Sequence, residues 1–305
     1  MPDTTFMNDF MNHSPLILPS SNGVRILLFV IGLLAGVAII SAVTLTSNTS
    51  TGSNTATVSS PFAYQFSSNG ILGEAGAMLE STSPYWWLNS GGYLSIKDGH
   101  GATAQGDLSL LDPWRIIYAA ANPTDTDGGK HPQNLLRLVT KSSWKEVREE
   151  ASFYIVRDNF SASPNQNASN GLLLMSRYQD AGQTLYYAGI RVDGTAVIKK
   201  KYKGTYYTMA QEKVFPGNYE GSSQDKNLLP HEEWVSLRSE TKTNEGGTVT
   251  VKLFMKRAGG EWKELLSATD TGKNFGATPI TTAGYGGIRT DFMDVKFDNF
   301  KLENI

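Results

Sequence analysis

The chain has 305 residues and no cysteine, and its 27 lysine and arginine residues nearly balance its 29 aspartate and glutamate residues. This balance argues against nucleic acid as a partner, because binding to phosphates needs an excess of basic side chains. Without cysteine no disulfide can support the fold, so an exported domain of this length has to depend on its core and on any bound metal.

An uncharged apolar run from Ile26 to Leu45 lies near the start of the chain. As a helix it would rise about 1.5 Å per residue and span about 30 Å, the thickness of the hydrocarbon core of a bilayer. We therefore expect a transmembrane anchor over residues 26–45, preceded by a short cytoplasmic leader over residues 1–25. A cleavable signal peptide is the alternative, although its apolar region is normally about 7–15 residues long.

The orientation of the anchor follows from the charges beside it. Arg25 is the only charge next to the run, and residues 46–60 form an uncharged linker rich in serine and threonine. The positive-inside rule then predicts a single-pass protein of the cell membrane with residues 61–305 outside the cytoplasm. Gly32 and Gly36 form a GxxxG pair. This spacing lets two membrane helices approach closely, so the sequence is also compatible with a homo-oligomer.

Residues 61–305 show the periodicity of β-strands. Short runs rich in β-branched and aromatic residues alternate with Asn, Asp, Gly and Ser, and Asp193-Gly194 between two such runs is typical of a tight hairpin. This pattern predicts an all-β domain, a two-sheet antiparallel jelly-roll sandwich. Residues 70–106 give no clear strand pattern. The predicted strands are 134–140, 151–156, 171–178, 185–192, 196–202, 205–210, 234–238, 248–256 and 295–302.

Two segments carry a resemblance to a known superfamily. Residues 285–302 (YGGIRTDFMDVKFDNFKL) resemble the closing strands of concanavalin A-like lectin/glucanase domains, which include laminin G-like jelly rolls, and residues 186–194 (YYAGIRVDG) resemble their central hairpin. The resemblance implies a jelly roll whose concave face takes carbohydrate. It also implies a structural calcium ion with Asp298 as a ligand. Residues 62–66 lack the acidic residue that often completes such a site, so the alternative is that Asp298 anchors a strand end.

Strand alternation selects candidate binding residues. Side chains two residues apart on a strand share a face, which would place basic and aromatic groups together on one sheet. Aromatic rings can stack on sugar faces, while arginine and amide groups bind hydroxyls and carboxylates. Our first hypothesis is therefore a membrane-anchored extracellular domain that binds a polysaccharide. Its expected binding residues are Gln133, Arg137, Arg177, Tyr187, Arg191 and Lys199.

Two other functions stay open on the same scaffold. Glycoside hydrolysis in this fold uses an E-x-D-x-x-E strand motif, which the sequence lacks, and the acidic run 146–150 is expected to be a solvated patch. A polysaccharide lyase would neutralise a uronate carboxylate and use tyrosine or histidine as the base. Residues 202–207 (YKGTYY) distantly resemble a strand of alginate-lyase-like members of the superfamily. A structural surface or filament subunit is the third possibility, and no catalytic residue is assigned.

Overall fold

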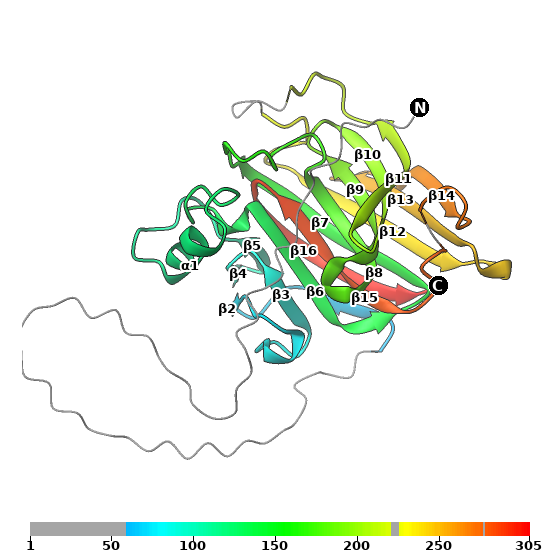
Figure 1. Ribbon diagram of the computed structural model, residues 1–305, viewed down its shortest axis with the longest axis horizontal. Coiled ribbons are helices and arrows are strands. Elements are labelled where there is room, and N and C mark those ends of the chain that lie inside the picture. The colour runs from blue at the N-terminus through cyan, green and yellow to red at the C-terminus, as the bar shows by residue number, and fades with distance from the viewer. Residues whose placement is uncertain (1–58, 221–225, 277) are drawn as a thin grey trace, which may run out of the picture.

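The computed structural model describes residues 59–220, 226–276 and 278–305, which form two β-sheets packed face to face (Figure 1). The paired strands within both sheets are antiparallel, so the predicted two-sheet antiparallel sandwich is confirmed. The predicted leader and anchor, residues 1–45, and the linker up to residue 58 lie outside the described residues. Within the described part of the chain, no helix has the length and apolar character of a membrane span.

The first sheet, sheet A, has nine strands among the described residues. Eight follow the order β14-β13-β12-β7-β16-β5-β4-β2, and β1 pairs with the free part of β16. The strands are β1 (Phe62–Tyr64), β2 (Gly70–Gly73), β4 (Tyr93–Lys97), β5 (His100–Thr103), β7 (Val147–Asp158), β12 (Trp234–Thr243), β13 (Val249–Arg257), β14 (Lys263–Asp270) and β16 (Met293–Asn304).

The second sheet, sheet B, has seven strands in the order β11-β10-β9-β8-β15-β6-β3. The strands are β3 (Trp86–Ser90), β6 (Leu135–Trp144), β8 (Gly171–Gln179), β9 (Thr184–Arg191), β10 (Thr195–Tyr202), β11 (Thr205–Lys213) and β15 (Gly284–Asp291). The predicted hairpin at Asp193-Gly194 joins β9 to β10, and Gly194 takes the positive φ of 78° that this tight turn requires.

Short helices connect the strands, and one longer helix, α1, lies at one side of the sandwich (Figure 1). The helix begins after Asp112, whose carboxylate accepts the backbone N–H groups of Trp114 and Arg115, and Pro113 occupies its first position. This Asp-Pro signal was missed in the sequence, as were strands β2 to β5. The helices are α1 (Pro113–Ala121), η2 (Met78–Glu80), η3 (Pro132–Asn134), η4 (Asp180–Gly182) and η5 (Glu245–Gly247).

The hydrophobic core lies between the two sheets. Phe153 and Val235 of sheet A and Leu174 and Ile288 of sheet B belong to one continuous buried cluster. A second apolar cluster draws its buried members from sheet B alone, and these residues alternate with the core residues along each strand. Because successive side chains point to opposite faces, this second cluster marks the outer face of sheet B.

Several ionisable side chains are buried between the sheets. Lys200 of β10 and Asp270 of β14 form an ion pair of 2.8 Å with both side chains fully buried, and the Tyr186 hydroxyl donates to Asp270 over 2.7 Å. Glu149 of β7 points into the core as well, where its Oε1 accepts the N–H of Gly287 over 2.7 Å. The expectation of a solvated acidic patch is therefore wrong for Glu149, because alternation along β7 turns this residue inward while Glu150 faces out.

Candidate functional site

The outer face of sheet B brings three of the predicted binding residues together. Tyr187 of β9 lies directly opposite Lys199 of β10 in the strand ladder, so the two side chains share this face. Arg137 of β6 lies opposite Arg289 of β15, on the same face and farther along the sheet. Strand alternation alone was enough to assign these residues to one surface.

Arg289 lies at the centre of this arrangement and was not among the predicted binding residues. Its Nε donates to Asp291 over 2.8 Å, and its Nη1 lies 3.4 Å from the hydroxyl oxygens of both Tyr187 and Tyr206. The Arg289 guanidinium also lies over the Tyr187 ring, 5.7 Å from its centroid. The signal was present in the sequence as the Gly-Gly-Ile-Arg segment, which had been used only to infer the fold.

Tyr206 and Lys201 complete the arrangement from strands β11 and β10, where they are direct ladder partners. The rings of Tyr187 and Tyr206 are stacked at 6.1 Å between centroids, and the Lys201 ammonium lies 4.9 Å from the Tyr206 centroid. Lys201 is only 6% exposed. We name this surface the basic–aromatic cluster; its members are Arg137, Tyr187, Lys199, Lys201, Tyr206 and Arg289.

Burial and neighbouring charges shift the pKa values of side chains in the cluster. Burial lowers the pKa of Lys201 from its usual 10.5, and the nearby positive charge of Arg289 lowers it further. Burial raises the pKa of Tyr187, whereas the Tyr206 pKa falls below its usual 10.0 because the charges of Arg289 and Lys201 outweigh its burial. The two stacked tyrosines therefore differ in acidity, and Tyr206 is the one that ionises more easily.

The cluster carries more positive than negative charge. Within the described part of the chain, Arg137 and Lys201 have no carboxylate within ion-pairing distance, and Arg137 instead donates its Nε to the hydroxyl of Ser90 over 3.1 Å. Glu74 is near enough for Arg137 to affect its pKa, but burial is the larger influence and raises that pKa. Half-buried cations without a carboxylate partner are costly to maintain, so this surface is suited to an anionic ligand.

The other predicted binding residues lie outside the basic–aromatic cluster. For two of them, Gln133 and Arg177, the structure differs from what strand alternation predicts. Gln133 precedes β6, in the turn η3, and is fully buried with its amide donating to Asp294 over 2.9 Å. Arg177 has a φ of 52° at an irregularity in β8, so its side chain turns between the sheets and donates to Thr243 over 2.9 Å. A bulge inverts the alternation on which the prediction for Arg177 relied.

Arg191 shares the outer face with Tyr187 by alternation but lies at the end of β9. Its guanidinium is used locally, because Nη2 pairs with Asp193 over 2.5 Å and Nε donates to the carbonyl of Ala168 over 2.8 Å. Arg191 therefore fixes the hairpin and the adjoining loop. It extends the predicted surface without joining the basic–aromatic cluster.

Asp298 lies on β16 at a break in the strand register. Its two carboxylate oxygens accept the backbone N–H and the side-chain amide of Asn299 over 2.7 and 3.0 Å. Across the residues that the structure describes, no group of three or more His, Asp or Glu side chains is arranged to hold a metal ion. The described contacts of Asp298 are those of a residue that stabilises a bulged strand, and its role as a calcium ligand stays a prediction.

Comparison with known proteins gave structural likenesses and no sequence relatives. No protein-family model and no curated protein matches the chain. Similar solved structures include the carbohydrate-binding module CBM66 of Bacillus subtilis, with 13% identity over 56% of this chain and 82% of that one and a TM-score of 0.40. Lectin I-B4 of Griffonia simplicifolia has 9% identity over 80% and 99% of the two chains, with a TM-score of 0.43.

A β-glucanase of Bacillus licheniformis has 8% identity over 82% of this chain and 100% of that one, with a TM-score of 0.44. All three likenesses are distant, with identities of 8–13% and TM-scores of 0.40–0.44. No residue role is transferred at this level of similarity. The function has to be inferred from the side chains of this chain.

Proposed function

We propose that the chain binds an acidic polysaccharide through the basic–aromatic cluster on the outer face of sheet B. The observation that carries this proposal is the pair Arg137 and Lys201, two cations of low exposure with no carboxylate partner among the described residues. A carboxylate of the ligand would supply the missing counter-charge in a site of low dielectric constant, where such a contact is stronger than in water.

Tyr206, the partly exposed tyrosine of the cluster, would contact the sugar rings, with the buried Tyr187 stacked on it. Tyr187 and Tyr206 present hydroxyl groups that are already near Arg289, so the polar edge of each ring faces the cations. A sugar ring offers both C–H groups, which pack on aromatic faces, and hydroxyls, which accept and donate hydrogen bonds. An arrangement of four cations around two stacked rings therefore discriminates in favour of charged sugars over neutral ones.

The site of action is part of the same proposal. The apolar run over residues 26–45 and Arg25 before it support a single-pass anchor in the cell membrane, with residues 61–305 on the outer side. The uncharged linker over residues 46–60 would then hold the domain a short distance from the bilayer. In this position the ligand is an extracellular glycan on a wall, a capsule or a neighbouring cell.

Calorimetric titration of the full-length chain in detergent tests the binding proposal. The probes are oligomers of polygalacturonate and the same oligomers with their carboxylates methyl-esterified. We expect the acidic oligomers to bind and the esterified ones to bind at least about tenfold more weakly. Lys201→Met should weaken the acidic interaction by about tenfold, because it removes one charged contact worth about 1.4 kcal/mol.

Lys263→Met is the matched control, because Lys263 is exposed on β14 in the other sheet and should leave the affinity unchanged. Higher salt should also weaken acidic binding by screening the cations. Equal affinity for the acidic and esterified oligomers would contradict the proposal, as would full affinity in the Lys201→Met variant.

A lyase is the second candidate, favoured by the unequal acidity of the two stacked tyrosines. Tyr206, with its lowered pKa, would take the C5 proton of a uronate whose carboxylate Arg289 neutralises. The electron pair would form the C4–C5 double bond as the C4–O bond breaks. Tyr187, which burial keeps protonated, would give its proton to the departing oxygen.

The ultraviolet absorbance of the conjugated product distinguishes this lyase from a binding module. Incubation with polygalacturonate should raise the absorbance in the lyase case, and Tyr206→Phe should abolish the rise while leaving the calorimetric affinity within a few-fold of the parent. Binding without any rise in absorbance would reject the lyase and retain the binding proposal.

A further inference from the structure

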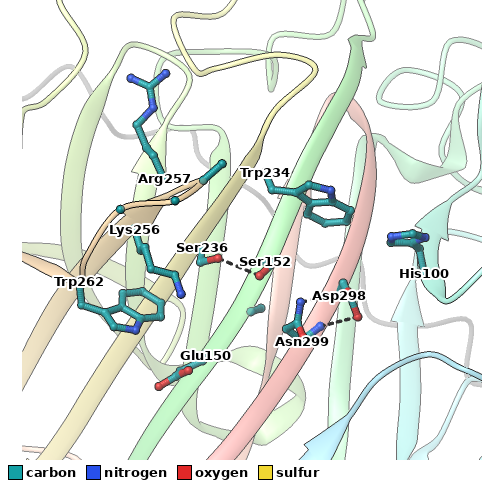
Figure 2. A pocket seen from close by; sticks show the side chains of 14 residues that line it. His100, Glu150, Ser152, Trp234, Ser236, Lys256, Arg257, Trp262, Asp298 and Asn299 are labelled. Carbon is teal, nitrogen blue, oxygen red and sulfur yellow. Dashed lines mark hydrogen bonds between the residues drawn. The ribbon is translucent and has the colours of Figure 1, made fainter.

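A hollow of about 650 Å³ lies on the outer face of sheet A (Figure 2). It therefore faces away from the basic–aromatic cluster on the outer face of sheet B. Its floor comes from strands β7, β12 and β16, and the turn between β13 and β14 forms part of its rim. This volume is within the range of about 300–1,000 Å³ that small-molecule sites occupy. We name it the sheet A groove.

Two tryptophans lie on either side of the sheet A groove. Figure 2 shows Trp234 and Trp262 on opposite sides of a pair of serines at the floor. Trp234 comes from β12, and Trp262 lies directly before β14. Both indole rings are partly exposed, so they can pack against a ligand between them. Aromatic rings at two ends of a polar floor are suited to the apolar faces of sugar rings.

Neighbouring side chains fix the orientation of both indoles. His100 stacks on Trp234 at 5.2 Å between centroids with an angle of 18°, and Tyr154 lies 5.4 Å away on the same sheet face. The Arg238 guanidinium lies 4.1 Å from the Trp262 centroid, and Glu150 holds Arg238 through an ion pair of 2.8 Å. The rings are therefore held in place before a ligand arrives, which lowers the entropic cost of binding.

The floor between the tryptophans offers hydroxyl, amide and carboxylate groups. The hydroxyls of Ser152 and Ser236 are hydrogen-bonded to each other over 2.8 Å, and Asp298 and Asn299 lie beside them (Figure 2). Such a hydroxyl pair can rotate to donate to a ligand or to accept from it. Sugar hydroxyls do both, so the chemistry of the floor complements that of a saccharide.

The charges of the sheet A groove are balanced, in contrast to those of the basic–aromatic cluster. Its lining holds two carboxylates, Glu150 and Asp298, and two permanent cations, Lys256 and Arg257. Two of these groups have ion-pair partners close by, since Glu150 pairs with Arg238 and Arg257 pairs with Glu233. A balanced lining gives an acidic ligand no net attraction and leaves the selection to stacking and hydrogen bonds.

From this geometry we propose that the sheet A groove is a second saccharide site, and that it takes a neutral oligosaccharide. Trp234 and Trp262 pack on the sugar rings, and Ser152, Ser236 and Asn299 bind their hydroxyls. The chain then carries two glycan sites of different charge preference on the two outer faces of one sandwich. This inference rests on the sheet A groove alone and stands whether or not the basic–aromatic cluster binds an acidic glycan.

Intrinsic tryptophan fluorescence of the full-length chain in detergent tests this proposal. The probes are uncharged hexasaccharides of glucose, xylose, mannose and galactose. We expect at least one of them to change the fluorescence in a saturable manner. Trp262→Ala should weaken that interaction by about tenfold or more, as the loss of one stacking ring implies. Phe160→Ala is the matched control, since Phe160 is an exposed aromatic residue outside the groove and should leave the affinity unchanged.

Ser236→Ala is a milder second variant that keeps the backbone and the core contacts, and a several-fold loss of affinity is expected. Lys201→Met should leave neutral binding intact, which separates this site from the basic–aromatic cluster. The absence of a fluorescence change with every probe would overturn the inference. Full affinity in Trp262→Ala would overturn it as well. A groove that instead mediates self-association would show a particle size that Trp262→Ala reduces, with no response to sugar.

Discussion

The two outer faces of the sandwich are built by the same strand alternation but handle charge differently. On sheet A several arginines have carboxylate partners: Arg238 pairs with Glu150, and Arg148 pairs with Glu240 and Glu303 over 2.7 Å each, while the partly exposed Lys256 has none among the described residues. On sheet B, Arg137 and Lys201 have no such partner among the described residues. The comparison indicates that a face suited to an anion can be recognised by a cation that is almost completely buried without a carboxylate partner, as Lys201 is, rather than by the number of basic residues.

The two outer faces also differ in how deeply their side chains are buried. Lys201 and Tyr187 on sheet B are almost completely buried, whereas the sheet A groove has partly exposed indoles and an open rim. Electrostatic contacts gain strength in a less hydrated site, while stacking contacts need exposed rings. Each face thus has the degree of exposure that suits its own mode of binding.

The largest effect is expected from the buried ion pair that lies between the two faces. Asp270→Ala would leave the Lys200 ammonium buried without its carboxylate and would remove the acceptor of the Tyr186 hydroxyl. We expect a loss of about 3–5 kcal/mol in the free energy of unfolding, measured by chemical denaturation. Because both faces depend on the same interior, binding at both sites should weaken together. A loss of binding on one face alone would show that the faces are supported independently.

A smaller effect is expected from Glu149, whose burial raises its pKa well above the usual 4.5. A raised pKa means that the folded state prefers the neutral acid. Its stabilising contribution is therefore present below about pH 4.5 and is lost as the pH rises through the folded-state pKa. The glutamine of the Glu149→Gln variant cannot ionise, so this pH dependence of stability should disappear. The variant should lose about 1–3 kcal/mol in the free energy of unfolding at every pH, because its amide protons lack acceptors.

Thermal unfolding from acid to mildly alkaline pH measures the Glu149 effect. The melting temperature of the parent should fall toward that of the Glu149→Gln variant as the pH rises. Parallel curves for the two proteins would contradict the assignment.

The pH dependence of binding sharpens the comparison of the faces further. Lys201 is charged below its pKa, which burial lowers from 10.5, and Tyr206 gains negative charge as the pH passes its own lowered pKa. Affinity for polygalacturonate oligomers should therefore decrease by about tenfold as the pH rises toward 10, about 1.4 kcal/mol. Neutral hexasaccharides at the sheet A groove should show no such decrease.

Calorimetry across this pH range, repeated with Tyr206→Phe and Lys201→Met, divides the effect between the two groups. Each variant should retain part of the pH dependence and the double variant should show almost none. A decrease of the same size in the double variant would remove both residues from the explanation.

The smallest effect is expected from an exposed ion pair on sheet A. Lys252 and Glu264 lie 3.0 Å apart with side chains 40% and 42% exposed. Glu264→Ala should change the free energy of unfolding by about 0.5 kcal/mol or less, because water screens the pair and the side chains lose entropy when they meet. A large loss in chemical denaturation would mean that sheet A depends on surface charge more than its exposure implies.

Much of the fold could be predicted from local patterns. The runs from residue 134 to residue 202 and from residue 234 to residue 256 became strands β6 to β10, β12 and β13, because alternation of β-branched and aromatic residues is a strong signal. Strands β2 to β5 were missed because residues 70–106 are rich in glycine and serine. The pairing of β5 with β16 and of β3 with β6 is set by contacts distant in the sequence.

The candidate site was predictable only in part. Arg137, Tyr187 and Lys199 followed from alternation, but Arg177 lies beyond a bulge that has no clear sequence signal, and Gln133 precedes its strand. Arg289, Lys201 and Tyr206 meet them only because β15 inserts between β6 and β8 and because β11 folds back on β10. The sheet A groove combines residues from β5, β7, β12, β13 and β16, and no local pattern indicates such a combination.

The sequence by itself determined the strand class, the antiparallel sandwich and the face of each regular strand position, since these depend on interactions between residues near one another along the chain. It also holds the apolar run over residues 26–45 on which the proposed membrane anchor depends. Only the tertiary structure decided which cations have carboxylate partners and which do not. Ion pairing and burial depend on distances between strands that are remote in sequence, and the buried Lys201, which has no carboxylate partner among the described residues, distinguishes the outer face of sheet B from that of sheet A.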